Sequence, residues 1–235
     1  MKKTISLLAV VLALTLLLTG CAGKAPQTGI TTTTKPAEET VDVSLGQVEG
    51  SVYENAFVGY GCALDENWAV YSAEELQDLS DLTKEMLKDT ELLESSEQYH
   101  YFLDMKAENA TDLTVINVGY TYLSVKDRLA NALLSEEQLV DSTISQKDTL
   151  AESFAATGIT LNSMEKAKIN FIGQQRWAIH TDAVISDEAI GDVPYYVLQI
   201  FDMTPGAAYY VTLTLASYLD DNTEALLDLF YPVSK

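Results

Sequence analysis

Residues 194–218, PYYVLQIFDMTPGAAYYVTLTLASY, place two segments rich in β-branched and aromatic side chains on either side of Thr204-Pro205-Gly206. Proline pre-sets φ for one corner of a β-turn, and glycine accepts the left-handed conformation that the next corner can require. Two strands joined by so short a turn pair antiparallel. The stretch therefore predicts an antiparallel hairpin with strands at 194–203 and 207–218.

Similar segments on the N-terminal side of this hairpin predict further strands. Gly173 separates two alternating runs, and Glu108-Asn109-Ala110-Thr111 separates two more, so each pair predicts another hairpin. The predicted strands outside the first hairpin are 51–55, 57–64, 68–71, 99–107, 113–123, 160–172 and 175–185.

Helical periodicity occupies the intervals between the strands. Ser135, followed by Gln138, has the pattern of a capping box, and Ser80 is a candidate internal cap that would interrupt the first helix. Asp221 is expected to cap the last helix and Pro232 to end it. The predicted helices are 73–95, 125–134, 136–156 and 221–230. Hairpins with segregated helices predict an α+β fold, with a single antiparallel sheet and helices packed on its faces.

The first 21 residues predict export and lipid attachment. Lys2 and Lys3 precede an apolar run at 5–18, which is the arrangement of a secretory signal, and the run is shorter than the roughly 20 residues that cross a bilayer. Leu18-Thr19-Gly20-Cys21 resembles the lipobox of bacterial lipoproteins. The resemblance implies cleavage before Cys21 and a diacylglyceryl group on its sulfur. The alternative is an ordinary secretory signal with an incidental cysteine.

Composition divides the chain into a signal peptide at 1–20, a linker at 21–48 and one globular domain at 49–235. The linker is rich in Thr, Lys, Pro and Gly and has no apolar periodicity, so it predicts a flexible tether. The net charge of −21 argues against nucleic acid as a partner, because binding to phosphates relies on cations. Once Cys21 is modified, Cys62 has no cysteine to pair with and is expected to be a buried small hydrophobe.

The order of elements also resembles a known group of folds. Tyr53-Glu54-Asn55, Gly59-Tyr60 and Asn67-Trp68 near the start, and a strand followed by a helix at 209–230, are similar to the PsbP-like fold. This group comprises the extrinsic subunit P of photosystem II and scattered bacterial lipoproteins. The resemblance implies an α-β-α sandwich over residues 50–233 and a role in binding or assembly, and it transfers no functional residue.

No sequence motif for catalysis or metal binding is decisive. His100 and His180 are the only histidines, each in a predicted strand, and neither belongs to a metal-binding motif. Ser163 and Lys166 match Ser-x-x-Lys, but a strand would point them to opposite faces. Residues 220–224 hint at a calcium loop, although helix capping explains them better. We therefore predict no catalytic residue, no metal ligand and no cofactor.

Tyrosines and threonines mark a candidate binding surface. Residues spaced i, i+2 share one face of a strand, which groups Tyr99 with Tyr101 and Tyr120 with Tyr122. Along the last strand, Tyr210, Thr212 and Thr214 share a face opposite an apolar face that looks like core. The predicted floor of a groove for a peptide, glycan or partner loop is Tyr99, Tyr101, Tyr120, Tyr122, Tyr210, Thr212 and Thr214. The alternative is that these residues line an interface between sheet and helix.

These features predict a non-catalytic, extracytoplasmic module, anchored to the bacterial cell membrane through lipidated Cys21, that binds a partner or contributes to envelope assembly. The alternative is a cell-envelope hydrolase that uses carboxylate catalysis. That alternative requires either two carboxylates that converge in a deep cleft or a histidine that meets a serine and an aspartate.

Overall fold

The computed structural model describes residues 44–87, 101–123, 134–155, 157–187, 190–204 and 207–234. Several predictions lie wholly or largely outside the described residues. They are the signal peptide at 1–20, lipidation of Cys21, most of the linker, the end of the first helix at 88–95, the groove residue Tyr99, the strand position of His100, the helix at 125–134 and the turn residues Pro205 and Gly206. Within the described ranges, no helix is both long enough and apolar enough to cross a membrane.

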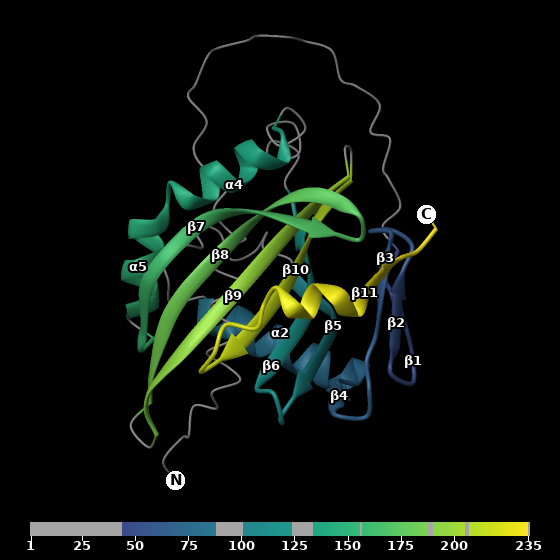
Figure 1. Cartoon of the computed structure of the whole chain (residues 1–235), viewed down its shortest axis with the longest axis horizontal. Helices are drawn as coiled ribbons and strands as arrows, with labels where there is room; N and C mark the ends of the chain where they lie inside the picture. Colours follow the sequence, from purple (N-terminus) through teal and green to yellow (C-terminus); the bar gives the residue numbers. More distant parts are fainter. Residues whose placement is uncertain are drawn as a thin grey trace.

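Within the described ranges, most strands belong to one antiparallel sheet of seven strands (Figure 1). In spatial order these are β4 (Trp68–Val70), β5 (Tyr101–Asn109), β6 (Thr114–Tyr122), β10 (Tyr209–Tyr218), β9 (Gly191–Met203), β8 (Gln174–Asp187) and β7 (Ile159–Phe171). The hairpin predicted from residues 194–218 is confirmed as β9 and β10, and β10 is the central strand.

The prediction of a single sheet is wrong. A second antiparallel sheet contains β1 (Gln47–Glu49), β2 (Val52–Asn55), β3 (Tyr60–Ala63) and β11 (Phe230–Pro232). This small sheet covers one face of the large sheet, and Tyr53, Tyr60 and Phe230 contribute buried side chains to the contact. Alternation along a strand shows which residues are extended, but it does not show which strands pair, so the division into two sheets could not be predicted.

The predicted C-terminal helix is also partly wrong. Residues Ala225–Leu229 form only a short 3₁₀ helix, η1, and the chain then enters β11. Phe230 pairs with Cys62 of β3, and its ring packs edge-on against Tyr60 at 5.9 Å between centroids. Burial of this aromatic ring therefore outweighs the helical pattern. Asp221 does not cap η1, which has no side-chain cap.

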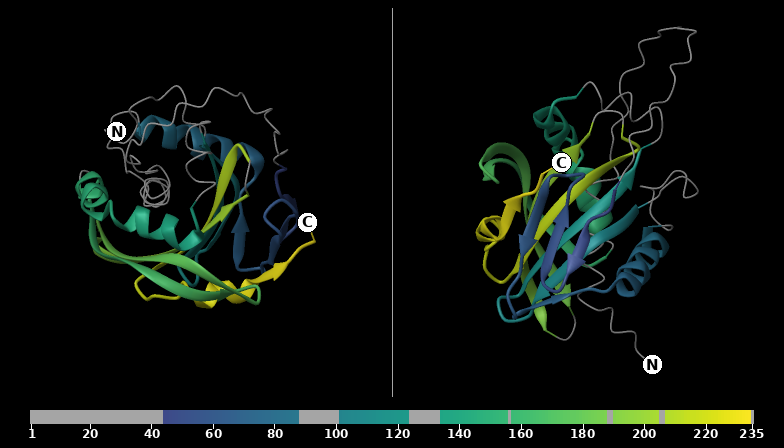
Figure 2. Two further views of the ribbon diagram at one scale, coloured as in Figure 1. Left: turned by 90° about the horizontal axis from the view of Figure 1, so that it is seen from above. Right: turned by 90° about the vertical axis from the view of Figure 1, so that its right-hand side faces the viewer.

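Among the described residues, three helices lie on the inner side of the curved large sheet (Figure 2, left). They are α2 (Ala73–Leu87), α4 (Glu136–Ile144) and α5 (Lys147–Ala155). The predicted capping box of Ser135 and Gln138 is confirmed at the start of α4. The predicted helix at 136–156 is divided at Ser145 and Gln146, which hydrogen-bond back to Asp141 O and Thr143 O as a helix end does.

The large sheet is consequently buried on both faces, in three layers. Its outer face, with Val118, Leu198 and Leu213, packs against the small sheet and η1. Its inner face packs at one flank against α2, through β5, and at the other flank against α4 and α5, through β7 and β8. The α+β class is confirmed, but one outer layer is a sheet in place of helices.

Candidate functional site

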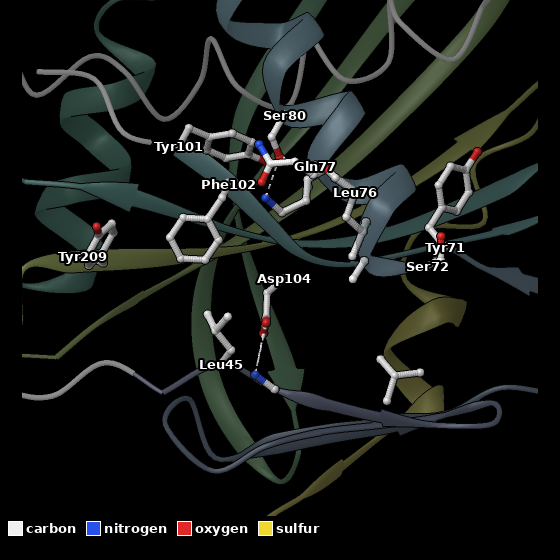
Figure 3. Close-up of a pocket in the computed structure, with 14 residues that line it drawn as sticks. Leu45, Tyr71, Ser72, Leu76, Gln77, Ser80, Tyr101, Phe102, Asp104 and Tyr209 are labelled. Atoms are coloured by element: carbon white, nitrogen blue, oxygen red, sulfur yellow. Dashed lines mark hydrogen bonds between the residues drawn. The ribbon is translucent and has the colours of Figure 1, made fainter. Parts of the chain in front are cut away.

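A pocket of about 840 Å³ opens at the edge of the large sheet beside β5 (Figure 3). The start of α2 forms one wall, the segment that leads into β1 forms the other, and β5 lies between them. Residues that line it include Tyr71, Leu76, Tyr101, Phe102, Asp104 and Tyr209. We call it the β5-edge pocket, and its volume lies within the range of known ligand sites.

The pocket arises because β4 covers only half of β5. β4 pairs with residues 107–109, and Tyr71 N donates to Lys106 O (3.0 Å) before the chain enters α2. The preceding half of β5 has no paired strand on this edge within the described part of the chain. Ser80 does not interrupt α2: its hydroxyl donates to Leu76 O (2.8 Å) and accepts from Leu103 N (3.2 Å). Ser80 therefore caps one backbone donor of the uncovered edge.

A half-buried carboxylate, that of Asp104, holds the opposite wall in place. Asp104 Oδ2 accepts hydrogen bonds from Tyr53 OH (2.6 Å), Asn55 Nδ2 (2.9 Å) and Gly46 N (2.9 Å). Burial raises the pKa of Asp104, and these three hydrogen bonds oppose the shift. Because its oxygen is engaged by donors of the same chain, Asp104 orders the wall.

Tyr120 connects this network to the segment that enters the domain. Asn55 Nδ2 donates to Tyr120 OH (2.7 Å), which in turn donates to Ser44 O (3.0 Å). Both side chains are fully buried, and burial raises the pKa of Tyr120. Residues 44–46 are thereby fastened to the large sheet, and Gln47 and Val48, assigned to the linker from sequence, form part of β1.

Aromatic contacts fix the end of the pocket. Phe102 stacks on Tyr120 with 5.0 Å between ring centroids and meets Tyr209 edge-on at 5.6 Å. Tyr209 also contacts Tyr122 at 5.5 Å. Such pairs hold rings in preferred orientations. Tyr209, which the sequence pattern assigned to the core, is thus a pocket residue, and Tyr122 supports it.

The structure divides the predicted groove residues between the two faces of the large sheet. Tyr120 and Tyr122 lie on the outer face, whereas Tyr101, Tyr210, Thr212 and Thr214 lie on the inner face. The four inner residues are between 1% and 6% exposed. Only Tyr101 lines the β5-edge pocket.

A glycine makes room for Tyr101. The ring of Tyr101 lies over Gly119 of β6, where an added Cβ would come within 2.7 Å of ring atom Cε2. Thr121 of β6 pairs with Tyr101 of β5 on one side and with Tyr210 of β10 on the other. Tyr101 therefore joins the pocket to the inner face.

A row of buried polar side chains crosses the inner face. Lys106, Asn117, Thr214 and Gln199 occupy neighbouring register positions on β5, β6, β10 and β9, and we call them the inner polar row. Beside this row lies Thr212. Among the described residues, neither Asn117 Nδ2 nor Thr212 Oγ1 has a hydrogen-bond partner, although both are buried. Burying a polar group without a hydrogen bond costs free energy of folding. A partner that hydrogen-bonds to these groups would offset that cost.

Lys106 is the charged member of the row. Its fully buried ammonium lies 2.7 Å from Glu108 Oε1 and 4.6 Å from the ring centroid of Tyr71. Burial lowers the pKa of Lys106, and the carboxylate of Glu108 opposes the shift. Sequence reasoning missed Lys106 and Asn117, although both are polar residues within predicted strands.

Two titratable side chains outside the pocket, His180 and Lys166, are each paired with carboxylates. His180 Nε2 lies 2.8 Å from Asp221 Oδ2, while Thr223 Oγ1 donates to the other oxygen of Asp221 at 2.7 Å. This threonine hydroxyl thus contacts the aspartate and not the histidine. Lys166 of β7 pairs with Glu137 and Asp141 at 2.9 and 2.8 Å.

The criteria set for the hydrolase alternative are not met within the described ranges. Asp104 is the only carboxylate among the residues found to line the β5-edge pocket, and His180 makes no described hydrogen bond to a serine. No group of three His, Cys, Asp or Glu side chains there could hold a metal ion. Cys62 is confirmed as a buried residue without a disulfide, and burial raises the pKa of its thiol to about 12.

Comparison with known proteins gives only weak structural likeness. No protein-family model matches the sequence, and no curated protein matches it. The fold is similar to the solution structure of cyanobacterial PsbP (CyanoP) from Synechocystis sp. PCC 6803, with 12% sequence identity and a TM-score of 0.39. The match covers 82% of this chain and 95% of that one. This agrees with the resemblance noted in the sequence, but a likeness at this level carries no argument about function.

Proposed function

We propose that the protein is a lipid-anchored extracytoplasmic module that binds an uncharged or cationic peptide segment of a partner in the β5-edge pocket. One observation supports this above all: a pocket of about 840 Å³ with aromatic and apolar walls lies where β4 leaves β5 uncovered. The bacterial cell membrane is the second partner, through the lipobox cysteine Cys21.

The walls of the pocket favour a peptide that presents apolar or aromatic side chains. Leu45 and Val48 at its rim are 55% and 43% exposed, although most large hydrophobic side chains are buried. Tyr71 and Tyr209 add broad ring surfaces, and tyrosine gives contact area at low cost in conformational entropy. An anionic ligand is disfavoured by the net charge of −21 and by Asp104.

Ser80 favours side-chain recognition over strand addition. A peptide that extends a sheet uses the free N–H and C=O groups of the edge strand. The N–H of Leu103 already donates to Ser80 Oγ, and α2 packs beside the same half of β5. The ligand is therefore held by the pocket walls.

Site-specific photo-crosslinking in cells tests the proposal. A photoreactive phenylalanine replaces Gln77, an exposed residue of α2 that lines the pocket, in the full-length protein. We expect a discrete crosslinked partner that is lost when Tyr209→Ala is added. The matched control carries the same label at Glu152, an exposed position of α5 outside the pocket. Equal crosslinking from both positions, or none from Gln77, would overturn the proposal.

Membrane fractionation tests the anchor separately. We expect wild-type protein in the membrane fraction and Cys21→Ser in the soluble extracytoplasmic fraction, because the acyl chains attach to that sulfur. Mass spectrometry of the N-terminal peptide should show the lipid. An unmodified thiol at Cys21, or a variant that remains on the membrane, would contradict lipid anchoring without affecting the test of the pocket.

A further inference from the structure

A second cleft, of about 600 Å³, lies at the opposite end of β5. The turn between β5 and β6, the residues that follow β10, and η1 form its walls. We call it the Leu113–Leu219 cleft, after the two leucines that line it. It shares no lining residue with the β5-edge pocket, so the two can be occupied independently.

The cleft presents apolar side chains to solvent. Leu113 is 41% exposed and Leu219 is 53% exposed, and Trp68 and Leu226 lie in the same cleft. Five large hydrophobic side chains are markedly exposed among the described residues. Two of them line the β5-edge pocket and two line the Leu113–Leu219 cleft. Exposed apolar surface gathered at cavities is typical of interaction sites.

The backbone holds both leucines in a conformation that branched side chains rarely adopt. Leu113 has φ of 52° and Leu219 has φ of 68°, in the left-handed region. Tyr218 N donates to Leu113 O (3.0 Å), and Leu219 N donates to Pro194 O (3.0 Å), so each turn is fastened to a neighbouring strand end. The two leucines are therefore presented from fixed positions.

The charge of the cleft defines the partner. Asp65, Asp112 and Asp220 line it, and no Lys, Arg or His is among the described residues of its wall. None of the three forms an ion pair with a described cation. Three uncompensated carboxylates around an apolar centre are complementary to a segment that combines cationic and large apolar side chains.

A buried hydroxyl gives independent support for a ligand. Thr114, at the start of β6, lines the cleft and is 3% exposed, and its Oγ1 has no hydrogen-bond partner among the described residues. Its side chain lies on the outer face with Ile116, toward η1 and Trp68, because side chains alternate along a strand. This hydroxyl is available to accept a hydrogen bond from an ammonium, a guanidinium or a peptide N–H.

We propose that the Leu113–Leu219 cleft is a docking site for a basic peptide segment of a partner protein, in which Lys or Arg flanks a large apolar residue. The apolar side chain packs between Leu113, Leu219 and Trp68, and the cations face the three aspartates. This site is additional to the β5-edge pocket and does not depend on it.

The test begins with an unbiased probe. A phage-displayed library of random 12-residue peptides is selected on the purified full-length protein, and enriched peptides are synthesised with a fluorescent label for anisotropy titrations. We expect enriched sequences to carry Lys or Arg next to Leu, Ile, Phe or Trp. Their Kd should rise at least tenfold in Asp112→Asn/Asp220→Asn and in Leu219→Ser.

Matched controls separate docking from general attraction to an acidic protein. Asp148→Asn/Glu152→Gln makes the same change in charge on exposed positions of α5, and Ile190→Ser removes an exposed hydrophobic side chain elsewhere. Each should change Kd by less than twofold. Thr114→Val adds a further measurement, since it should weaken binding severalfold without lowering the unfolding midpoint.

Three outcomes would overturn the proposal. The first is enrichment of peptides without a cation, or of none. The second is equal weakening by the α5 control variant, which would indicate non-specific electrostatic attraction. The third is loss of binding in Tyr209→Ala with no effect in the cleft variants, which would assign the peptides to the β5-edge pocket.

Discussion

The outer and inner faces of the large sheet are made by the same strands but differ in chemistry. On β10, Val211, Leu213 and Leu215 point outward into an apolar core, whereas Thr212 and Thr214 point inward. The outer side also contains the Asp104 network, in which the carboxylate accepts hydrogen bonds from three donor groups. On the inner side, Asn117 Nδ2 and Thr212 Oγ1 have no partner among the described residues.

This contrast separates stability from binding. The outer face buries a large apolar area, which is how a core contributes to folding, and the polar groups of its Asp104 network hydrogen-bond to one another. Two buried hydroxyls on this side, Tyr60 OH and Thr114 Oγ1, have no partner among the described residues. The inner face contains buried polar groups that weaken folding unless something else hydrogen-bonds to them. Variants that exchange the chemistry of the two faces should therefore have effects of different size and sign.

The largest effect is expected from Leu213→Ala on the outer face. Leu213 is fully buried, so truncation removes transfer free energy and leaves a cavity. We expect a loss of about 3 kcal/mol in the free energy of unfolding, measured by urea titration. Leu219→Ala, at an exposed leucine, is the control and should cost much less. Equal losses would show that the outer face is not the main source of stability.

The Asp104 network should give the next effect, and it depends on pH. A carboxyl whose pKa is raised by folding binds its proton more tightly in the folded state, so its contribution is present below about pH 4 and is lost as pH rises through the folded pKa. We expect Asp104→Asn to cost about 1–2 kcal/mol near pH 4 and less at pH 7. Urea midpoints at both pH values, with Asp148→Asn as control, check the sign. A difference that grows with pH would contradict it.

Much of the fold could be predicted because local patterns coincide with tertiary packing. The hairpin at 194–218 and the capping box at Ser135 depend on neighbouring residues, and both are present in the structure. The pairing of Phe230 with Cys62 joins residues far apart in sequence, and no local pattern contains that information. The small sheet was missed for this reason.

The candidate site was predicted only in part for a related reason. Spacing of i, i+2 shows which residues of one strand share a face of the sheet. Which face they share with residues of the next strand depends on the register between the two strands. Because the register shifts between Leu103 and Met105, the side chains of Phe102, Asp104 and Met105 all lie on the outer face. Tyr101 therefore faces the inner core and Tyr120 the outer one. The β5-edge pocket follows from the short length of β4, which composition does not reveal.

A loss of similar size is expected when a hydroxyl is placed on the outer face. Val118→Thr nearly preserves volume and puts an oxygen between Leu213 of β10 and Met105 of β5, where polar groups are unfavourable. We expect a cost of about 1–2 kcal/mol by urea titration, without a change in the slope of the transition. If the free energy of unfolding does not fall, the new hydroxyl has found a hydrogen-bond partner in the outer core. The two faces would then differ less in chemistry than we infer.

The reverse exchange, made on the inner face, should have the smallest effect and the opposite sign. Thr212→Val removes a buried hydroxyl that lacks a partner among the described residues and keeps the β-branched shape. We expect the free energy of unfolding to stay the same or to rise by up to about 1 kcal/mol. A loss above about 1 kcal/mol would show that Thr212 is satisfied within the fold, and the inner face would then be ordinary core. A gain in stability together with weaker crosslinking from Gln77 would instead extend the binding surface from the β5-edge pocket, through Tyr101, onto the inner face.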